Sequence, residues 1–362
     1  VSEVQSNDER GDASRPDSVS TASQPFSTNQ PRPADERDVR MNDITFVILS
    51  FEGPDRYSHA GGLGSRVAGL SKALADSDFE THLCFIGCPD LPGHEVTENG
   101  KLHLHRWCQW ISRHHPSGVY DGEEGKRLDW NRSLPDWLAT EIVNPRVRAG
   151  GSVVVWGEEW QTTSSILILQ EMSTRLGWGG RVHLFWNANN TFGFHLIPWG
   201  SLKQAATITT VSRYMKHLMW RYGVNAQVIP NGIPESWLHP VDQEAIRRLA
   251  RIFRDRLSLV KVARWDPDKR WKMAVESVAL LKRFGYRPLL FARWGTEHLG
   301  DGLAMAERNG LQWVSIDWER DDVDSFIEAI PPALTADMVV LSGFLSREQR
   351  RALFRTADAV LA

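Results

Sequence analysis

The sequence has few cysteines and no long apolar run. Its three cysteines, Cys84, Cys88 and Cys108, are too few for a disulfide framework, and they lack the second close-spaced pair that a cysteine zinc site needs. Because buried thiols suit a reducing compartment, we expect a cytoplasmic protein. No segment approaches the apolar length of a membrane span, and the N-terminus lacks the apolar core of a signal peptide, so only peripheral contact with a membrane is left open.

A strong charge imbalance is missing as well. The 42 Lys and Arg residues nearly cancel the 45 Asp and Glu residues, and the net charge is −3. Such a chain has no global basic field, so nucleic acid is not expected as a partner. Tryptophan is abundant, with 16 residues, and aromatic faces of this kind stack on sugars or bases as well as filling cores.

The length of 362 residues favours two domains. Residues 1–40 are rich in Ser, Asp, Asn, Gln and Pro, and they are predicted to be a disordered tail because they bury too little apolar surface to fold. From residue 44 onward, apolar β-rich runs alternate with helical patterns. This alternation predicts an α/β protein with two doubly wound, Rossmann-like domains, residues 41–240 and 241–362, facing a cleft that holds the ligands. The predicted strands are residues 44–50, 79–86, 101–105, 152–156, 181–187, 206–211, 226–230, 257–262, 287–292, 338–342 and 358–362.

Two helices have clear sequence signals. Ser212 is expected to cap the N-terminus of a helix over residues 213–222. The apolar spacing in residues 269–284 predicts a second helix, which buries Met273, Val278 and Leu281.

A glycine-rich loop separates the first predicted strand from the helix that follows it. The segment HAGGLGSRVAGLSKAL, residues 59–74, contains Gly61, Gly62 and Gly64 at the start of an amphipathic pattern. Free N–H groups and the positive end of a helix dipole at such a place suit a diphosphate. The alternative is a tight strand-to-helix turn, which glycine serves equally well. The GxGxxG dinucleotide fingerprint is absent.

Two cations follow the first strand of the second domain. In ARWDPDKRW, Arg264 lies at the end of the strand and Lys269 is expected to open the next helix. Both side chains are suited to neutralising a diphosphate. The alternative is a solvated turn in which Asp266 and Asp268 pair with the two cations.

Three segments together resemble the GT-B glycosyltransferases, specifically the retaining branch that includes glycogen and starch synthases. They are HAGGLGSRVAGLSKAL, ATITTVSRYMKHLMWRYGVNAQVIPNGI and VKVARWDPDKRWKMAVESVALL, and the resemblance runs from about residue 44 to the end. It implies a nucleoside-diphosphate-sugar donor bound mainly by the C-terminal domain and an acceptor bound by the N-terminal domain. By position it implies that Gly61, Gly62 and Asn231 contact the donor, while Arg264 and Lys269 stabilise the charge on the leaving diphosphate. It also implies that no metal and no further cofactor take part.

The chain departs from this family at three places. His59 and Ala60 stand where the synthases carry a lysine, which argues against glycogen synthesis. Asn189 and Asn190 replace a His-Asn pair; asparagine can still bind a sugar hydroxyl, and His195 either supplies the missing imidazole or is an ordinary histidine. The paired glutamates of the family would follow the last residue, so we expect a chain cut short within its second domain and inactive alone.

Acidic and aromatic residues also end the strand in VVVWGEEWQTTSSI. Glu158, Glu159 and Trp160 suit hydrogen bonding to an acceptor sugar and stacking on its apolar face. The resemblance matches Glu159 and Trp160 to the Asp-Trp of a synthase turn, and Glu159 is expected to be catalytic together with Arg264 and Lys269. In the alternative interpretation, one of the two glutamates caps the following helix.

The sequence therefore predicts a glycosyltransferase. The reaction expected is transfer of a hexosyl group, with retention, from a nucleoside-diphosphate sugar to a glycan, lipid or small acceptor. A sugar-nucleotide epimerase or phosphorylase of the same fold, and a non-catalytic sugar- or nucleotide-binding module, remain alternatives.

Overall fold

The computed structural model describes residues 43–295, 298–320, 322–343 and 345–361, so the tail predicted over residues 1–40 lies outside the described residues. The chain divides after Ile229 into two compact units, and each is described by itself. Within the described residues, no helix has both the length and the apolar character needed to cross a bilayer.

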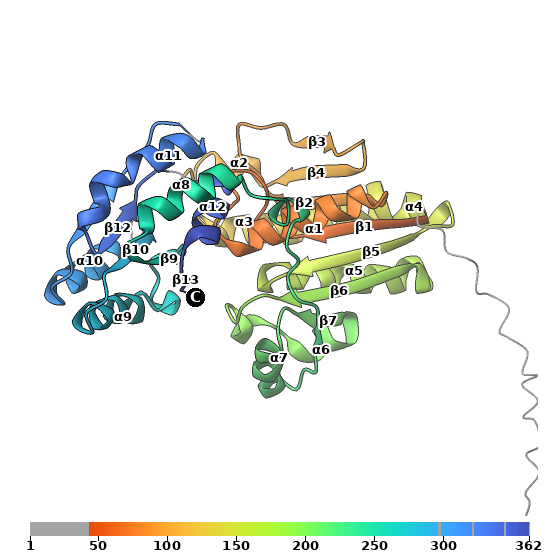
Figure 1. The fold of residues 1–362 in the computed structure, drawn as a ribbon. Coiled ribbons are helices and arrows are strands. Elements are labelled where there is room, and N and C mark those ends of the chain that lie inside the picture. Colours follow the sequence, from red (N-terminus) through yellow and green to blue (C-terminus); the bar gives the residue numbers. More distant parts are fainter. Residues whose placement is uncertain (1–42, 296–297, 321, 344, 362) are drawn as a thin grey trace, which may run out of the picture. The chain divides into compact units, whose positions relative to one another are not determined.

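The first unit is built on an eight-stranded sheet (Figure 1), with the strand order β3-β4-β2-β1-β5-β6-β7-β8. Neighbouring strands of this sheet run parallel except for β3 and β4, which are antiparallel. The strands are β1 Ile44–Leu49, β2 Glu80–Ile86, β3 His94–Thr97, β4 Leu102–Trp107, β5 Ser152–Glu158, β6 Val182–Ala188, β7 Thr207–Thr210 and β8 Gln227–Val228. Apolar runs such as ITFVIL form central strands because both faces of a parallel sheet are covered by helices.

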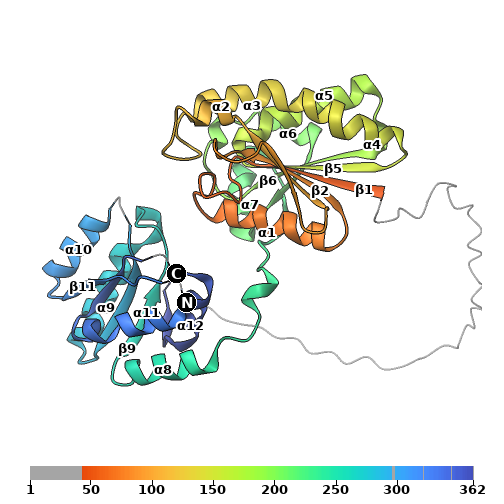
Figure 2. The same ribbon diagram turned by 90° about the horizontal axis from the view of Figure 1, so that it is seen from above.

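Helices cover both faces of this sheet (Figure 2). Val67 of α1 packs with Ile48 and Leu83 on one face, whereas Trp130 of α3 and Ile166 of α5 belong to the larger core on the other. The helices are α1 Gly62–Asp76, α2 Gln109–Ser112, α3 Glu123–Leu138, α4 Asn144–Arg148, α5 Thr163–Leu176, α6 Trp199–Ala205 and α7 Arg213–Met219.

The second unit repeats the same design on a smaller scale. Its parallel sheet has five strands in the order β11-β12-β10-β9-β13, with separate apolar cores on its two faces. The strands are β9 Leu257–Lys261, β10 Pro288–Arg293, β11 Trp313–Ile316, β12 Met338–Leu341 and β13 Ala359–Val360. The helices are α8 Gln243–Phe253, α9 Trp271–Arg283, α10 Leu299–Arg308, α11 Val323–Ala329 and α12 Arg347–Thr356. The predicted α/β class and doubly wound sheets are confirmed.

Local details follow the sequence with a few exceptions. The Ser212 side chain accepts a hydrogen bond from the Met215 N–H, so the predicted cap of α7 is confirmed. The prediction that Met273 is buried is wrong, because α9 turns Trp271, Val275 and Val278 toward the core and leaves Met273 58% exposed. The strands β3 and β11 were not predicted, because each has only four residues and neither has a continuous apolar run.

Candidate functional site

Polar side chains gather where three neighbouring strands of the first sheet end. The strands β1, β5 and β6 lie side by side and run parallel, so their carboxyl ends meet at one edge. Glu52 follows β1, Glu158 ends β5, and Asn187 is the second-to-last residue of β6. All three side chains are buried, which is costly unless each is hydrogen-bonded.

The glycine-rich loop binds the carboxylate of Glu52. The backbone N–H groups of Gly61 and Gly64 donate to Glu52 Oε2 at 2.8 and 2.9 Å. The start of α1 is therefore an anion site, as its sequence indicates, and the anion found there belongs to the protein itself. The predicted contact of Gly61 and Gly62 with a diphosphate stays a prediction.

Tyr120 joins this loop to a cavity. Its hydroxyl donates to Glu52 Oε1 at 2.8 Å, and burial beside that carboxylate raises the pKa of the phenol. A cavity of about 550 Å³ opens beside the loop. It is lined by Arg56, Tyr57, His59, Ala60, Cys88 and residues 116–121. Its volume falls within the range of small-molecule sites, about 300–1,000 Å³.

Glu158 ties three elements together. Its Oε1 accepts from Arg66 Nε of α1 at 2.9 Å, and its Oε2 accepts from Asn187 Nδ2 and Asn189 Nδ2 at 2.8 and 2.7 Å. Burial raises the pKa of Glu158, and the Arg66 charge and the amide donors oppose that rise. With its carboxylate fully buried, Glu158 positions the loop after β6.

Glu159 is held in an unusual backbone conformation. Its φ of 65° and ψ of 170° lie in a region that is essentially reserved for glycine, and such strain persists only where the surroundings enforce it. The Glu159 N–H donates to the Asn187 carbonyl, and Trp186 Nε1 donates to the Glu159 carbonyl, each at 3.0 Å. Strained residues of this kind concentrate at functional sites.

The side chain of Glu159 is also unusual. Its Oε1 accepts from the Asn189 N–H at 2.7 Å, but its Oε2 is buried without a hydrogen-bond partner among the described residues. Burial raises the pKa of Glu159 to about 8, so the carboxyl group is largely protonated near neutral pH. Glu159 is the N-cap residue of the short 3-10 turn Trp160–Thr162, but its side chain makes no capping hydrogen bond there. The longer helix α5 has Thr162 as its N-cap and no side-chain cap, so neither glutamate caps α5.

The other residues predicted to contact the acceptor sugar are Asn190 and His195, which lie on the segment after β6, and Trp160, which packs against that segment. Trp160 packs so closely on Gly193 that a Cβ added there would lie 2.3 Å from the indole. Asn190 is exposed, and its Oδ1 accepts from the Phe192 N–H at 2.7 Å. His195 is exposed in the short turn Phe194–Leu196.

In the second unit the two predicted cations lie after β9, each beside an aspartate. Arg264 is 3.1 Å from Asp266, and Lys269 is 2.9 Å from Asp268, in exposed pairs of the kind that the solvated-turn alternative describes. Lys269 does not open the helix: it lies in the turn Pro267–Lys269, and α9 begins at Trp271. Asn231 is exposed at the start of this unit.

Sequence reasoning missed four residues of the first unit: Glu52, Arg66, Tyr120 and Asn187. Glu52 has a signal that resembles that of Glu158, since both acids stand at the end of a buried strand. Tyr120 has no such signal, because it lies in a loop 68 residues away from its partner Glu52.

Comparison with known proteins establishes the fold. No family model and no curated protein sequence matches the chain. Three solved structures are similar: the catalytic domain of starch synthase IV from Arabidopsis thaliana (12% identity, TM-score 0.58), sucrose-phosphate synthase from Thermosynechococcus elongatus (14%, 0.58) and a UDP-forming α,α-trehalose-phosphate synthase from Burkholderia xenovorans (14%, 0.52). The similarity covers 86–88% of this chain and 75–77% of those chains. At this level of identity it is the fold that is shared, and the chain has the GT-B fold of these glycosyltransferases.

Proposed function

We propose that the chain is a glycosyltransferase that moves a hexosyl group from a nucleoside-diphosphate sugar to a hydroxyl of a carbohydrate or lipid-linked acceptor. The observation that carries the proposal is the polar cluster around Glu52, Glu158 and Glu159 at the carboxyl edge of a GT-B sheet, where this architecture places ligands. The similar starch synthase structure is bound to ADP and acarbose, and the trehalose-phosphate synthase structure holds glucose-6-phosphate. These ligands support a nucleotide-linked donor and a sugar acceptor.

The acceptor would occupy the cavity beside the glycine-rich loop. Its wall offers the guanidinium of Arg56, the imidazole of His59 and the carboxylate of Asp121, which suit the hydroxyls of a sugar. The Tyr120–Glu52 hydrogen bond fixes the inner wall. Asn189, Asn190 and His195 of the segment after β6 would bound the acceptor, together with Trp160, which follows β5 and packs against that segment.

The donor would be bound through its diphosphate. In the proposal, Arg264 and Lys269 exchange their exposed aspartate partners for phosphate oxygens, with Asn231 as a further donor contact. Exposed ion pairs contribute at most about 1 kcal/mol, so such an exchange costs little. Positive charge placed where negative charge develops is the largest single contribution in many transferases.

The chemical step breaks the bond between the anomeric carbon and the diphosphate oxygen. The acceptor oxygen bonds to that carbon on the same face, and its proton passes to the departing phosphate. Configuration is thereby retained, and neither a metal nor another cofactor enters the proposed step. Glu158 and Glu159 act as positioning residues through Asn189 and Arg66.

A donor and acceptor panel tests the proposal. The full-length protein is incubated with UDP-, ADP- and GDP-hexoses, with and without glucose-6-phosphate, maltooligosaccharides or lipid-linked sugars, and the release of nucleoside diphosphate is measured. Acceptor-dependent release is expected. Saturable nucleotide binding with no turnover on any acceptor would instead indicate a binding module, and conversion of the donor sugar without an acceptor would indicate an epimerase. A pyridoxal phosphate absorbance band would indicate a phosphorylase.

A further inference from the structure

Four histidines meet on one face of the first sheet, on three neighbouring strands. His82 of β2 stands opposite His103 of β4, and His105 of β4 stands opposite His94 of β3. Because side chains two residues apart on a strand share a face, His103 and His105 lie on the same side of β4. The rings of His82 and His103 are stacked, with centroids 4.6 Å apart, and those of His94 and His105 are stacked at 4.7 Å.

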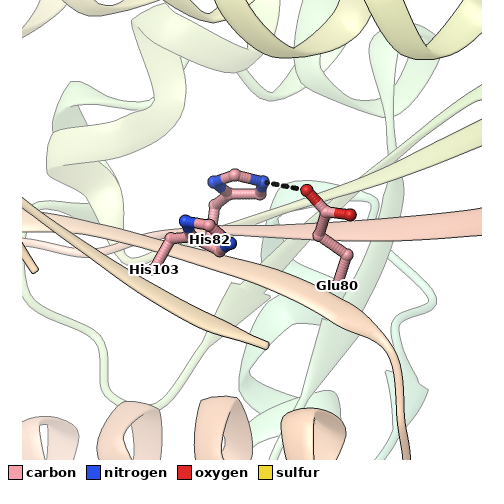
Figure 3. A group of neighbouring side chains, drawn as sticks. All are labelled: Glu80, His82 and His103. Atoms are coloured by element: carbon pink, nitrogen blue, oxygen red, sulfur yellow. Dashed lines mark ion pairs between the residues drawn. The ribbon is translucent and has the colours of Figure 1, made fainter. Parts of the chain in front are cut away.

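A carboxylate completes the group. Glu80, the first residue of β2, lies on the same face as His82, and its Oε1 is 3.6 Å from His82 Nε2 (Figure 3). One ligand atom each from Glu80, His82 and His103 lies within 4.8 Å of the other two.

We propose that Glu80, His82 and His103 form a binding site for one divalent transition-metal ion, of which Zn²⁺ is the best fit. Two imidazoles and one carboxylate are a common zinc ligand set, and a water molecule supplies the fourth ligand. With zinc–ligand bonds of about 2.0–2.1 Å, tetrahedral ligands lie about 3.3 Å apart, so small side-chain rotations close the site. Ca²⁺ and Mg²⁺ are excluded as preferred ions because they favour oxygen ligands.

The two other histidines support the proposed ligands from behind. His82 Nδ1 lies 3.0 Å from His105 Nε2, and His103 Nδ1 lies 3.3 Å from His94 Nε2. In each proposed ligand histidine, Nδ1 thus faces a ring nitrogen of a second imidazole, which leaves Nε2 to bind the ion. Such second hydrogen bonds fix the tautomer and orientation of metal-binding histidines.

Burial determines how the ion would enter and what it would do. His82 is buried, His103 is half-buried and Glu80 is exposed, so one side of the site faces solvent. Glu80 lies at the amino-terminal end of its strand, whereas the carboxylate cluster of the proposed transfer site lies at carboxyl-terminal ends. The ion is therefore a structural one: it would link β4 to β2 and, through His94, would also stabilise the position of the short edge strand β3.

Zinc binding to the full chain, purified without a histidine tag and stripped with a chelator, tests the proposal. Calorimetric titration should give one Zn²⁺ per chain, with a raised Tm. Cobalt should give the visible absorption of a tetrahedral nitrogen–oxygen site. His103→Gln and Glu80→Gln, both at exposed or half-buried positions, should each weaken zinc binding about 10-fold or more.

A control variant shows whether a loss of zinc affinity is specific to the proposed ligands. His183→Gln removes an exposed strand histidine of β6, and it should leave zinc affinity unchanged. Three results would overturn the proposal: no saturable binding, wild-type affinity in both His103→Gln and Glu80→Gln, or a sulfur-to-cobalt charge-transfer band that assigns the ion to a cysteine such as Cys88.

Discussion

Arg66 and Glu158 form a buried ion pair that joins α1 to the end of β5. Arg66 Nε lies 2.9 Å from Glu158 Oε1, and the two side chains are 6% and 0% exposed. The pair is separated by 92 residues in the chain. Because Glu158 also accepts from Asn187 and Asn189, the same carboxylate holds the glycine-loop helix and the segment after β6 in one arrangement.

Removing one member of this pair should be strongly destabilising. Arg66→Met leaves Glu158 buried without its cation, and breaking a buried pair in this way costs about 3–5 kcal/mol. Urea unfolding followed by tryptophan fluorescence measures the loss. The double variant Arg66→Met/Glu158→Gln should recover part of it, because the uncompensated charge is gone.

An exposed pair on the same helix is the control. Lys72 pairs with Asp76 at 3.4 Å and also with Glu98, and its side chain is 52% exposed. Because both pairs are solvent-accessible, Lys72→Met should change the free energy of unfolding by only about 1 kcal/mol. Equal losses in Lys72→Met and Arg66→Met would contradict the importance of burial.

Glu159 should make stability depend on pH. Its folded pKa of about 8 lies above the value in the unfolded chain, so the folded state binds the extra proton. Its favourable contribution is complete below the unfolded pKa and is lost as pH rises toward about 8. Relative to the wild type, Glu159→Gln should therefore gain about 2–4 kcal/mol between pH 5 and pH 8.5.

Comparing Glu159→Gln with the wild type at each pH removes the contributions of all other titrating groups, because those groups are the same in both proteins. Denaturant unfolding at several pH values gives the difference directly, and Glu244→Gln, at an exposed position of α8, should show no such trend. A pH-independent difference between Glu159→Gln and the wild type would mean that Glu159 is ionised throughout.

Two glycines of the loop should respond differently to alanine. A Cβ at Gly64 would lie 3.1 Å from Glu52 Oε2 and 3.1 Å from the Gly53 carbonyl, whereas a Cβ at Gly62 meets nothing within 4 Å. Gly64→Ala should destabilise the protein by about 1–3 kcal/mol and displace Glu52. Gly62→Ala should stay within about 1 kcal/mol of the wild type.

The same two glycine variants can also be compared by their affinity for nucleotides. If Gly62 backs the donor diphosphate, Gly62→Ala will weaken UDP or ADP binding without loss of stability. Unchanged nucleotide affinity in Gly62→Ala would remove Gly62 from the donor site and leave the loop as the holder of Glu52.

Arg264 and Lys269 should affect turnover and not folding. Their side chains are 60% and 42% exposed, so Arg264→Ala and Lys269→Ala should unfold like the wild type. In the full-length protein, loss of one charge-stabilising group should lower kcat about 10²–10³-fold. Lys272→Ala, an exposed lysine of α9, is the control, and unchanged kcat in Lys269→Ala would exclude its phosphate role.

Much of the fold could be predicted because its signals are local. The apolar runs of β1, β5, β9 and β12 are short and continuous, and Ser212 caps its helix through a residue three positions away. Predictions failed where local patterns are weak, as for β3, whose four residues include two that are charged or titratable in HEVT. They also failed at Met273, because a helical period alone leaves the edge of a buried stripe ambiguous.

The candidate site was only partly predictable. The strand-end acids Glu158 and Glu159 and the glycine-rich loop could be found from their positions after buried strands. Their actual partners could not: Glu52 fills the loop, and Arg66 and Tyr120 reach across many residues.

The sequence by itself determined the order of strands and helices and the place of the loop, because periodicity, capping and glycine act over a few residues. The tertiary structure decided which carboxylate occupies that loop, which glutamate is protonated and which histidines meet on β2, β3 and β4. Those outcomes depend on burial and on distances between residues far apart in the chain, and only the packed sheet sets them.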